Sequence, residues 1–278
     1  GALVTVIAVI AIVPYLALQL KAVGMSVEVL AGTSRAESPF ADTALYIALL
    51  LAAFAILFGT RGIDASEHHR GMMLAIAAES LVKLLAFVVV GAYALTRGTH
   101  LEALTQPIQA AAREALPRGF IAQSVLAFVA ILCLPRQFQV GVVECENASD
   151  VRPARWLFPL YLALICVFAL PIAYSGAMAA QGHHVNADTY VLWLPLANGD
   201  GLFAVLAYVG GFSAATGMVI VASVALATMI SNELVMPVLL RIRALRLEQR
   251  DDLSGIVLGV RRVAIVVLAL LAFTYYRA

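Results

Sequence analysis

A stripe of small and hydroxyl-bearing residues runs along one face of the otherwise apolar segment 210–237. Its members are Ser213, Thr216, Ser223, Ala227 and Ser231, with Thr228 on its flank. In a helix these positions fall within a sector of roughly 80°. Hydroxyl oxygens are neutral ligands for a cation inside a bilayer, and small residues also let a second helix approach closely. The stripe therefore predicts either a cation path or tight helix packing, and both interpretations stay open.

Two ionisable residues, Glu79 and Lys83, interrupt a second apolar segment, residues 72–96. They lie four residues apart, which places them on one face of a helix with the acid on the N-terminal side, the favourable order for a pair. An isolated charge at the centre of a bilayer costs about 2.5–3.5 kcal/mol, so each is expected to neutralise the other. Either the pair is a strut inside the bundle, or Glu79 and Ser80 belong to the path of a coupling ion.

A proline ends a third apolar segment, residues 119–135. Pro135 lacks a backbone N–H and disrupts the helix before it, and Arg136 and Gln137 follow it directly. Unwound backbone at membrane depth is tolerated where it lines a cavity or is buried in protein, as in the broken helices of secondary transporters. Pro135 therefore marks either a broken helix beside a solute path or an ordinary helix end.

The composition places these segments in a membrane. Hydrophobic residues make up 63% of the 278 residues, charged residues make up 13%, and the mean hydropathy is +0.95. A soluble domain is only about 45–50% apolar. The net charge of +1 argues against nucleic acid as a partner. The three cysteines are odd in number and lack CxxC spacing, which predicts free thiols rather than disulfides or a zinc site.

Seven apolar segments are long enough, or nearly so, to cross a bilayer core that needs about 20 helical residues. They cover residues 3–24, 43–59, 72–96, 119–135, 156–178, 202–240 and 256–276, within one domain over residues 1–278. The sixth exceeds a single crossing, and we expect Gly210 and Gly211 to separate a short outer helix from the spanning part. Residues 179–201 are expected to form a polar loop, with Tyr190 and Trp193 near the membrane interface.

The distribution of basic residues predicts the orientation. If the first segment starts in the cytoplasm, the inner side holds eleven Lys or Arg residues and the outer side holds six. Residues 179–201, which would then lie outside, contain neither type. The positive-inside rule therefore favours a cytoplasmic start.

Other patterns that could carry chemistry lack the necessary context. The adjacent histidines at 68–69 and at 183–184 do not make a facing set of metal ligands, and the glycine-rich patches lack a nucleotide-binding motif. No catalytic triad or pair of carboxylates follows from the spacing, so this chain is not expected to be an enzyme or to hold a cofactor. It opens at Gly1 without a leader pattern, so we expect an internal fragment.

Five stretches, in order, resemble the core helices of the sodium:solute symporter family. They are residues 14–22, 79–87, 134–144, 155–161 and 210–237. The resemblance covers nearly the whole chain, and is closest to the branch in which a symporter-like membrane domain is fused to a sensor histidine kinase. It implies an all-α polytopic membrane protein of the inverted-repeat sodium/leucine-transporter architecture, with solute and ion near the midplane. The chain would hold the third to ninth core helices, in agreement with the orientation expected above.

The resemblance also implies ligands for Na⁺ as the coupling ion. The family's hydroxyl pair on the eighth core helix corresponds to Ala227 and Thr228, so only Thr228 keeps its oxygen. The carbonyl of Val224, one turn earlier, and the hydroxyl of Ser231 are the further expected ligands. No other metal is expected.

The chain departs from the family in a second place. Family transporters usually have Thr-Asp followed by Gln in the region that here reads Glu79-Ser80 and Lys83. Together with Ala227, this change favours altered ion use, or a domain that senses more than it moves.

Two functions remain open. The first is a Na⁺-coupled secondary transporter of a small polar solute, such as an amino acid or a carboxylate, with Tyr15, Gln19, Gln123 and Gln137 along the solute path. The second is a solute-sensing input domain, whose conformational equilibrium is read by a covalently linked cytoplasmic histidine kinase. Either function places the chain in the lipid bilayer of a cell membrane, expected to be a bacterial inner membrane.

Overall fold

A computed structural model of the chain describes residues 1–32, 42–60, 70–96, 119–183, 185–242 and 253–278. The longer helices are α1 (Ala2–Ala31), α2 (Thr43–Gly59), α3 (Arg70–Thr96), α5 (Phe120–Cys133), α7 (Val151–Ala179), α9 (Gly201–Met229) and α11 (Ser254–Arg277). The shorter helices are α6 (Pro135–Phe138), α8 (Tyr190–Ala197), α10 (Met236–Arg241), the 3-10 helices η3 (Ala148–Asp150) and η4 (Ala187–Thr189), and the π-helices η2 (Gln139–Val143) and η5 (Ile230–Val235). The described residues contain no strand, so the all-α prediction is confirmed for them.

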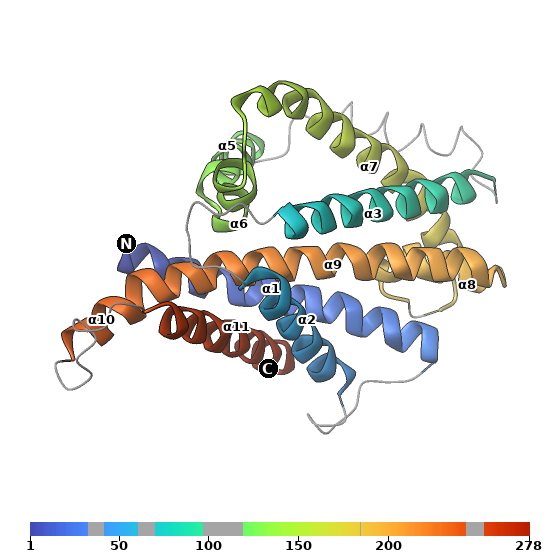
Figure 1. The fold of residues 1–278 in the computed structure, drawn as a ribbon. Coiled ribbons are helices and arrows are strands. Elements are labelled where there is room, and N and C mark those ends of the chain that lie inside the picture. Colours follow the sequence, from blue (N-terminus) through green and yellow to red (C-terminus); the bar gives the residue numbers. More distant parts are fainter. Residues whose placement is uncertain (33–41, 61–69, 97–118, 184, 243–252) are drawn as a thin grey trace.

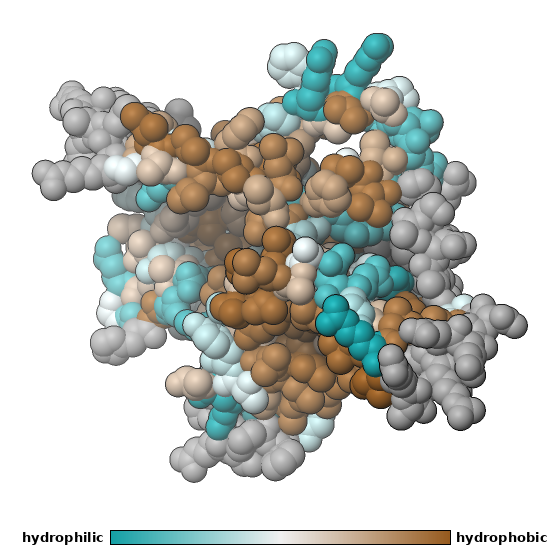
Figure 2. All heavy atoms as spheres, turned by 90° about the vertical axis from the view of Figure 1, so that its left-hand side faces the viewer, coloured by the Kyte–Doolittle hydropathy of each residue, from teal (hydrophilic) through white to brown (hydrophobic). Residues whose placement is uncertain are grey.

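Several helices have the length and composition of membrane spans. Five are long and apolar enough to cross a membrane, and α5 with the bent continuation Pro135–Val143 makes up to six. Helix α2 is apolar but has only 17 residues. The outer helices carry large apolar side chains on their exposed faces, and Figure 2 shows such side chains gathered in broad areas of the surface. The chain therefore has the helices of a multi-pass membrane protein.

Helix α9 lies at the centre of the bundle. It packs against α1, α2 and α11 on one side and against α3 and α8 on the other (Figure 1). Every residue from Val219 to Ala227 is buried. A helix that is apolar and buried all round belongs to the interior of a bundle rather than to its lipid-facing surface.

Helix α9 is also continuous through its glycine pair. The expected break at Gly210 and Gly211 is wrong, because α9 runs without interruption from Gly201 to Met229. Gly210 is buried and faces Ala86 of α3, so closely that a β-carbon at this position would overlap the methyl group of Ala86. The glycine therefore serves the close approach of two helices, as small residues commonly do in membranes. The irregular part of this segment lies further on, in the π-helix η5.

The chain bends sharply at Pro135. Helix α5 ends at Cys133, Leu134 is extended at φ −73° and ψ 125°, and Pro135 is the first residue of α6. The two apolar helices meet at an angle of 53°. A residue that precedes proline is driven out of the helical region by contact with the proline ring, which explains the extended Leu134. Pro135 therefore lies at a bend within a helical segment that continues on both sides, and does not mark the end of that segment.

The connection between α7 and α9 is more ordered than the expected polar loop. It contains η4 and the short apolar helix α8, which packs against both α7 and α9. Leu192 and Leu194 of α8 are buried, and the ring of Trp193 lies 5.8 Å from that of His183. Helix α8 lies at the opposite end of the bundle from the N-terminus and α10 (Figure 1).

An ion pair joins the ends of α2 and α11. Asp42 caps α2 by accepting a hydrogen bond from the backbone N–H of Ala44 at 2.9 Å. Its second carboxylate oxygen accepts a hydrogen bond of 3.0 Å from Arg277, the last residue of α11. Asp42 is only 5% exposed, so the pair is largely removed from water.

Some residues used in the sequence predictions lie outside the described part of the chain. They are Arg35, Arg61, His68, His69, Arg97, Arg113, Arg118, His184, Arg243, Arg246 and Arg250. The orientation therefore stays a prediction. Cys133, Cys145 and Cys166 are all described and all free, as expected.

Candidate functional site

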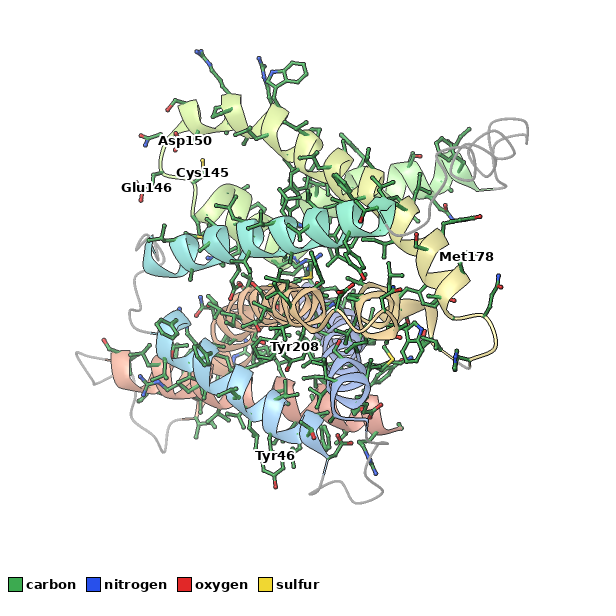
Figure 3. All side chains as sticks on the ribbon, turned by 90° about the vertical axis from the view of Figure 1, so that its right-hand side faces the viewer. Tyr46, Cys145, Glu146, Asp150, Met178 and Tyr208 are labelled. Atoms are coloured by element: carbon green, nitrogen blue, oxygen red, sulfur yellow. The ribbon has the colours of Figure 1, made fainter. Side chains whose placement is uncertain are left out.

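A cavity of about 540 Å³ lies between α1, α3, α7, α8 and α9. Most of its lining is apolar, from residues such as Phe87, Leu192 and Phe212. The side chains that bring polar groups to it are Gln19, Ser26, Lys83, Asp188, Thr189 and Tyr208. Tyr208 comes from the central helix α9 and lies in the middle of the bundle in Figure 3. A mainly apolar cavity with a few polar groups is the usual form of a small-molecule site.

The cavity reaches the surface at the connection between α7 and α9. Asp188 of η4 is exposed there, while its neighbour Thr189 is buried. Two hydrogen bonds fix this turn: Asn186 accepts one from the backbone of Asp188 at 3.0 Å, and the hydroxyl of Thr189 donates one to the carbonyl of Asn186 at 2.8 Å. The turn therefore presents a carboxylate at the cavity mouth.

Two predicted site residues, Gln19 and Lys83, contribute to the cavity wall. Gln19 comes from α1 and Lys83 from α3, and both are half-buried. The Lys83 Nζ lies 5.6 Å from the centre of the Tyr161 ring on α7. Sequence spacing alone could not show which face of α1 or α3 lines a cavity, because apolar residues surround both side chains in the sequence.

Glu79 does not form a direct ion pair with Lys83. Its carboxylate packs against Gly217 of α9, where the absence of a side chain gives it room. Its backbone carbonyl accepts a hydrogen bond from Ser213 at 3.3 Å. Lys83 acts on the Glu79 carboxylate electrostatically. However, the two charged groups do not approach within 4.0 Å of each other in the described structure.

A polar connection runs from the helix break at Pro135 to the inner end of the cavity. The guanidinium of Arg136 lies over the Tyr15 ring, 4.5 Å from its centre, and donates a hydrogen bond to the Tyr15 hydroxyl. That hydroxyl donates in turn to the Met218 sulfur at 2.7 Å. Met218 lines the cavity. Tyr15 of α1 is therefore in contact with both Arg136 at the helix break and Met218 of α9. A movement of the broken helix would change the cavity wall at Met218.

In the sequence predictions Arg136 belongs to the break at residues 135–137 and to the inner basic residues, but it has no role of its own at the site. In the structure Arg136 is half-buried in α6 rather than in a solvated loop. The sequence feature that indicates a role for Arg136 is its position directly after Pro135 in an apolar segment, because a charged side chain there needs a partner.

The other two residues predicted for the solute path lie elsewhere. Gln123 is exposed on α5 and lines neither cavity. Gln137 lines a second cavity of about 810 Å³ near the start of α7, together with Glu146 and Asp150. Figure 3 places Glu146 and Asp150 at the edge of the molecule, away from Tyr208. The structure therefore groups Tyr15 and Gln19 near one cavity and does not bring Gln123 and Gln137 to it.

The three predicted ion ligands share successive turns of α9 and η5. The Thr228 hydroxyl donates to the Val224 carbonyl at 3.0 Å, and as a donor it keeps both lone pairs of its oxygen for a cation. Ser231 is completely buried, and its hydroxyl has no hydrogen-bond partner within the described structure. None of the three lines either cavity.

No protein-family model, curated protein or solved structure matches the chain. Its chemistry is therefore inferred from its own geometry. The first cavity combines one ammonium, one carboxylate, one amide and several hydroxyls with apolar walls, which is the usual composition of a small-molecule site. The described residues contain no group of three or more His, Cys, Asp or Glu that could hold a metal ion.

Proposed function

We propose that the chain is the membrane domain of a secondary transporter that carries a small polar solute. The observation that carries this proposal is the connection from the helix break to the cavity, through Arg136, Tyr15 and Met218. The membrane is a cell membrane, and by the resemblance to symporter-like domains it is a bacterial inner membrane. The resemblance also supports the inverted-repeat transporter architecture as the arrangement to which these helices belong.

The size and position of the cavity support a small solute. A volume of about 540 Å³ falls within the range of roughly 300–1,000 Å³ that is usual for small-molecule sites. The cavity is lined by Asp188 at the connection between α7 and α9 and by Met218 beside the middle of the long helix α9. A cavity that extends from a connecting turn to the middle of a spanning helix fits a solute site near the midplane of a transporter.

The helix break supports transport rather than a static pocket. Helices α5 and α6 meet at 53°, and Arg136 at the start of α6 holds Tyr15 of α1. If α6 moves relative to α5, this contact moves with it, and the inner end of the cavity changes shape. Broken helices serve this purpose in secondary transporters because they concentrate motion at one point.

Na⁺ is the coupling ion that we propose. The proposed ligands are the Thr228 hydroxyl, the Val224 carbonyl and the Ser231 hydroxyl, which lie on successive turns of α9 and η5. The first two correspond to the ligands that the resemblance implies. The unpartnered, buried hydroxyl of Ser231 supports this assignment, since a buried hydroxyl without a partner is unfavourable.

Uptake by the full-length protein in proteoliposomes tests the proposal. A panel of labelled amino acids, carboxylates and sugars is offered with an inward Na⁺ gradient and again with choline in place of Na⁺. Gln19→Ala removes an amide from the cavity, and Gln181→Ala removes one from an exposed position as the matched control. We expect Na⁺-dependent uptake of at least one solute, reduced by the change at Gln19 and not by the change at Gln181.

Two results would contradict the proposal. If uptake is the same in choline as in Na⁺, then Na⁺ is not the coupling ion, and Thr228 and Ser231 are not its ligands. Solute binding without any uptake would contradict transport. It would favour the alternative function, a sensing domain whose solute occupancy controls a linked histidine kinase.

A further inference from the structure

Lys83 brings an ammonium to the cavity wall with no carboxylate in direct contact with it. The residue lies in the middle of α3, is half-buried and lines the cavity. Its ammonium lies 5.6 Å from the centre of the Tyr161 ring. Within the described structure it has no carboxylate oxygen within 4.0 Å and no hydrogen-bond acceptor. An ammonium carries three donors, and leaving them unmet at membrane depth is unfavourable.

The neighbouring charged groups do not meet this need. Glu79, one turn away on the same helix, turns its carboxylate against Gly217. Asp188 is exposed at the cavity mouth. Arg136, the next cation, is already bound to Tyr15. No carboxylate of the described residues therefore contacts the Lys83 ammonium.

A second unmet polar group lies beside Lys83. The Tyr161 hydroxyl is buried and has no hydrogen-bond partner in the described part of the chain. The Gln19 amide, on the same cavity wall as Lys83, adds two more donors. Apolar residues such as Phe87 and Phe212 make up most of the remaining wall.

We propose that the solute is a small carboxylate with an apolar remainder, and that its carboxylate binds the Lys83 ammonium. The proposal rests on the proposed function and narrows its substrate class. A carboxylate supplies the acceptors that the ammonium lacks, and a charge-assisted hydrogen bond is about twice as strong as a neutral one. The apolar walls accommodate the rest of the solute.

Binding of matched acids and amides tests this assignment. Butyrate and leucine are the acids, and butyramide and leucinamide are the corresponding amides. Each is titrated against the full-length protein in nanodiscs by calorimetry. We expect at least one acid to bind, and its amide to bind at least about 10-fold more weakly.

Variants at the two charged positions separate solute binding from a structural pair. Lys83→Met should weaken binding of the acid about 10- to 100-fold and leave binding of the amide nearly unchanged. Lys83→Arg should retain most of the acid binding. Glu79→Gln should strengthen acid binding, because it removes a competing negative charge. In a purely structural pair, the changes at Glu79 and Lys83 would both weaken binding. The thermal midpoint of each ligand-free variant shows whether it is folded.

The proposal is overturned if no acid binds, if the amides bind as well as the acids, or if folded Lys83→Met binds the acid like the parent protein. Transport and this assignment fail in different ways. If a neutral solute is taken up and Lys83→Met does not change that uptake, the transport proposal holds and the carboxylate assignment is wrong. Acid binding that depends on Lys83, without any uptake, would support the carboxylate assignment and contradict transport.

Discussion

Adding one methyl group at Gly210 and at Gly211 is expected to change stability in opposite directions. The two glycines are neighbours in the middle of α9. A β-carbon at Gly210 would overlap the methyl group of Ala86 and lie 3.7 Å from the α-carbon of Lys83. A β-carbon at Gly211 would meet nothing within 4 Å. The pair therefore offers a test position and a matched control on one turn of one helix.

The expected magnitudes follow from helix propensity and packing. Alanine is more favourable than glycine inside a helix by about 0.5–1 kcal/mol, and both variants gain this amount. Overpacking in a tight contact costs about 1–3 kcal/mol, and only Gly210→Ala incurs this cost. The upper part of that range applies, because the Ala86 methyl group is fixed to its helix and cannot rotate away. Gly211→Ala should be more stable than the parent protein, and Gly210→Ala should be less stable by up to about 2 kcal/mol.

Equilibrium unfolding of the purified protein in mixed micelles, by titration with SDS, measures these differences. The double variant Gly210→Ala with Ala86→Gly should recover most of the lost stability, because the new methyl group then occupies the space of the old one. If Gly210→Ala is as stable as Gly211→Ala, α3 and α9 do not approach at this point. The role given to Gly210 in the fold would then be wrong.

Three further predictions concern the ion pair, the helix break and the ion ligands. Arg277→Met should lower the free energy of unfolding by about 1–2 kcal/mol, because it removes a charge-assisted hydrogen bond from the buried Asp42 carboxylate. The double variant with Asp42→Asn should lose less than the two single losses combined in the same SDS titration, and additive losses would contradict the pairing. Tyr15→Phe removes the hydrogen-bond acceptor of Arg136 and should reduce solute uptake about 10-fold. Its unfolding midpoint should stay near that of the parent protein. Unchanged uptake would show that the contact between Arg136 and Tyr15 does not affect the cavity. Thr228→Val keeps the side-chain shape and should abolish Na⁺ stimulation of uptake, and a normal response to Na⁺ would remove this hydroxyl from the ion site.

The positions of the helices could be predicted from the sequence because they depend on local properties. Each of the seven expected apolar segments contains a described helix, although α2 and α5 are each too short to cross a bilayer alone. The bend at Pro135 follows from the proline ring and from the residue before it, so it needs no knowledge of the tertiary structure.

The site could be predicted only in part, because it depends on which face of each apolar helix is turned inward. Gln19 and Gln123 look alike in the sequence, since each is an amide within an apolar segment. The structure places Gln19 in a cavity wall and leaves Gln123 exposed. Arg136 and Tyr15 are 121 positions apart, and nothing local to either residue indicates the other. The role of Gly210 was missed for the same reason, since it is set by Ala86 on another helix.

The complete burial of α9 between Val219 and Ala227 affects how this chain tolerates amino-acid substitutions. In a helix that faces lipid, one aliphatic residue replaces another at little cost, because acyl chains adjust to any shape. Between Val219 and Ala227 every side chain meets protein instead, so even exchanges among valine, leucine and isoleucine disturb fixed neighbours. The stretch that looks most interchangeable by hydropathy is thus the one where randomised libraries should return the fewest functional clones.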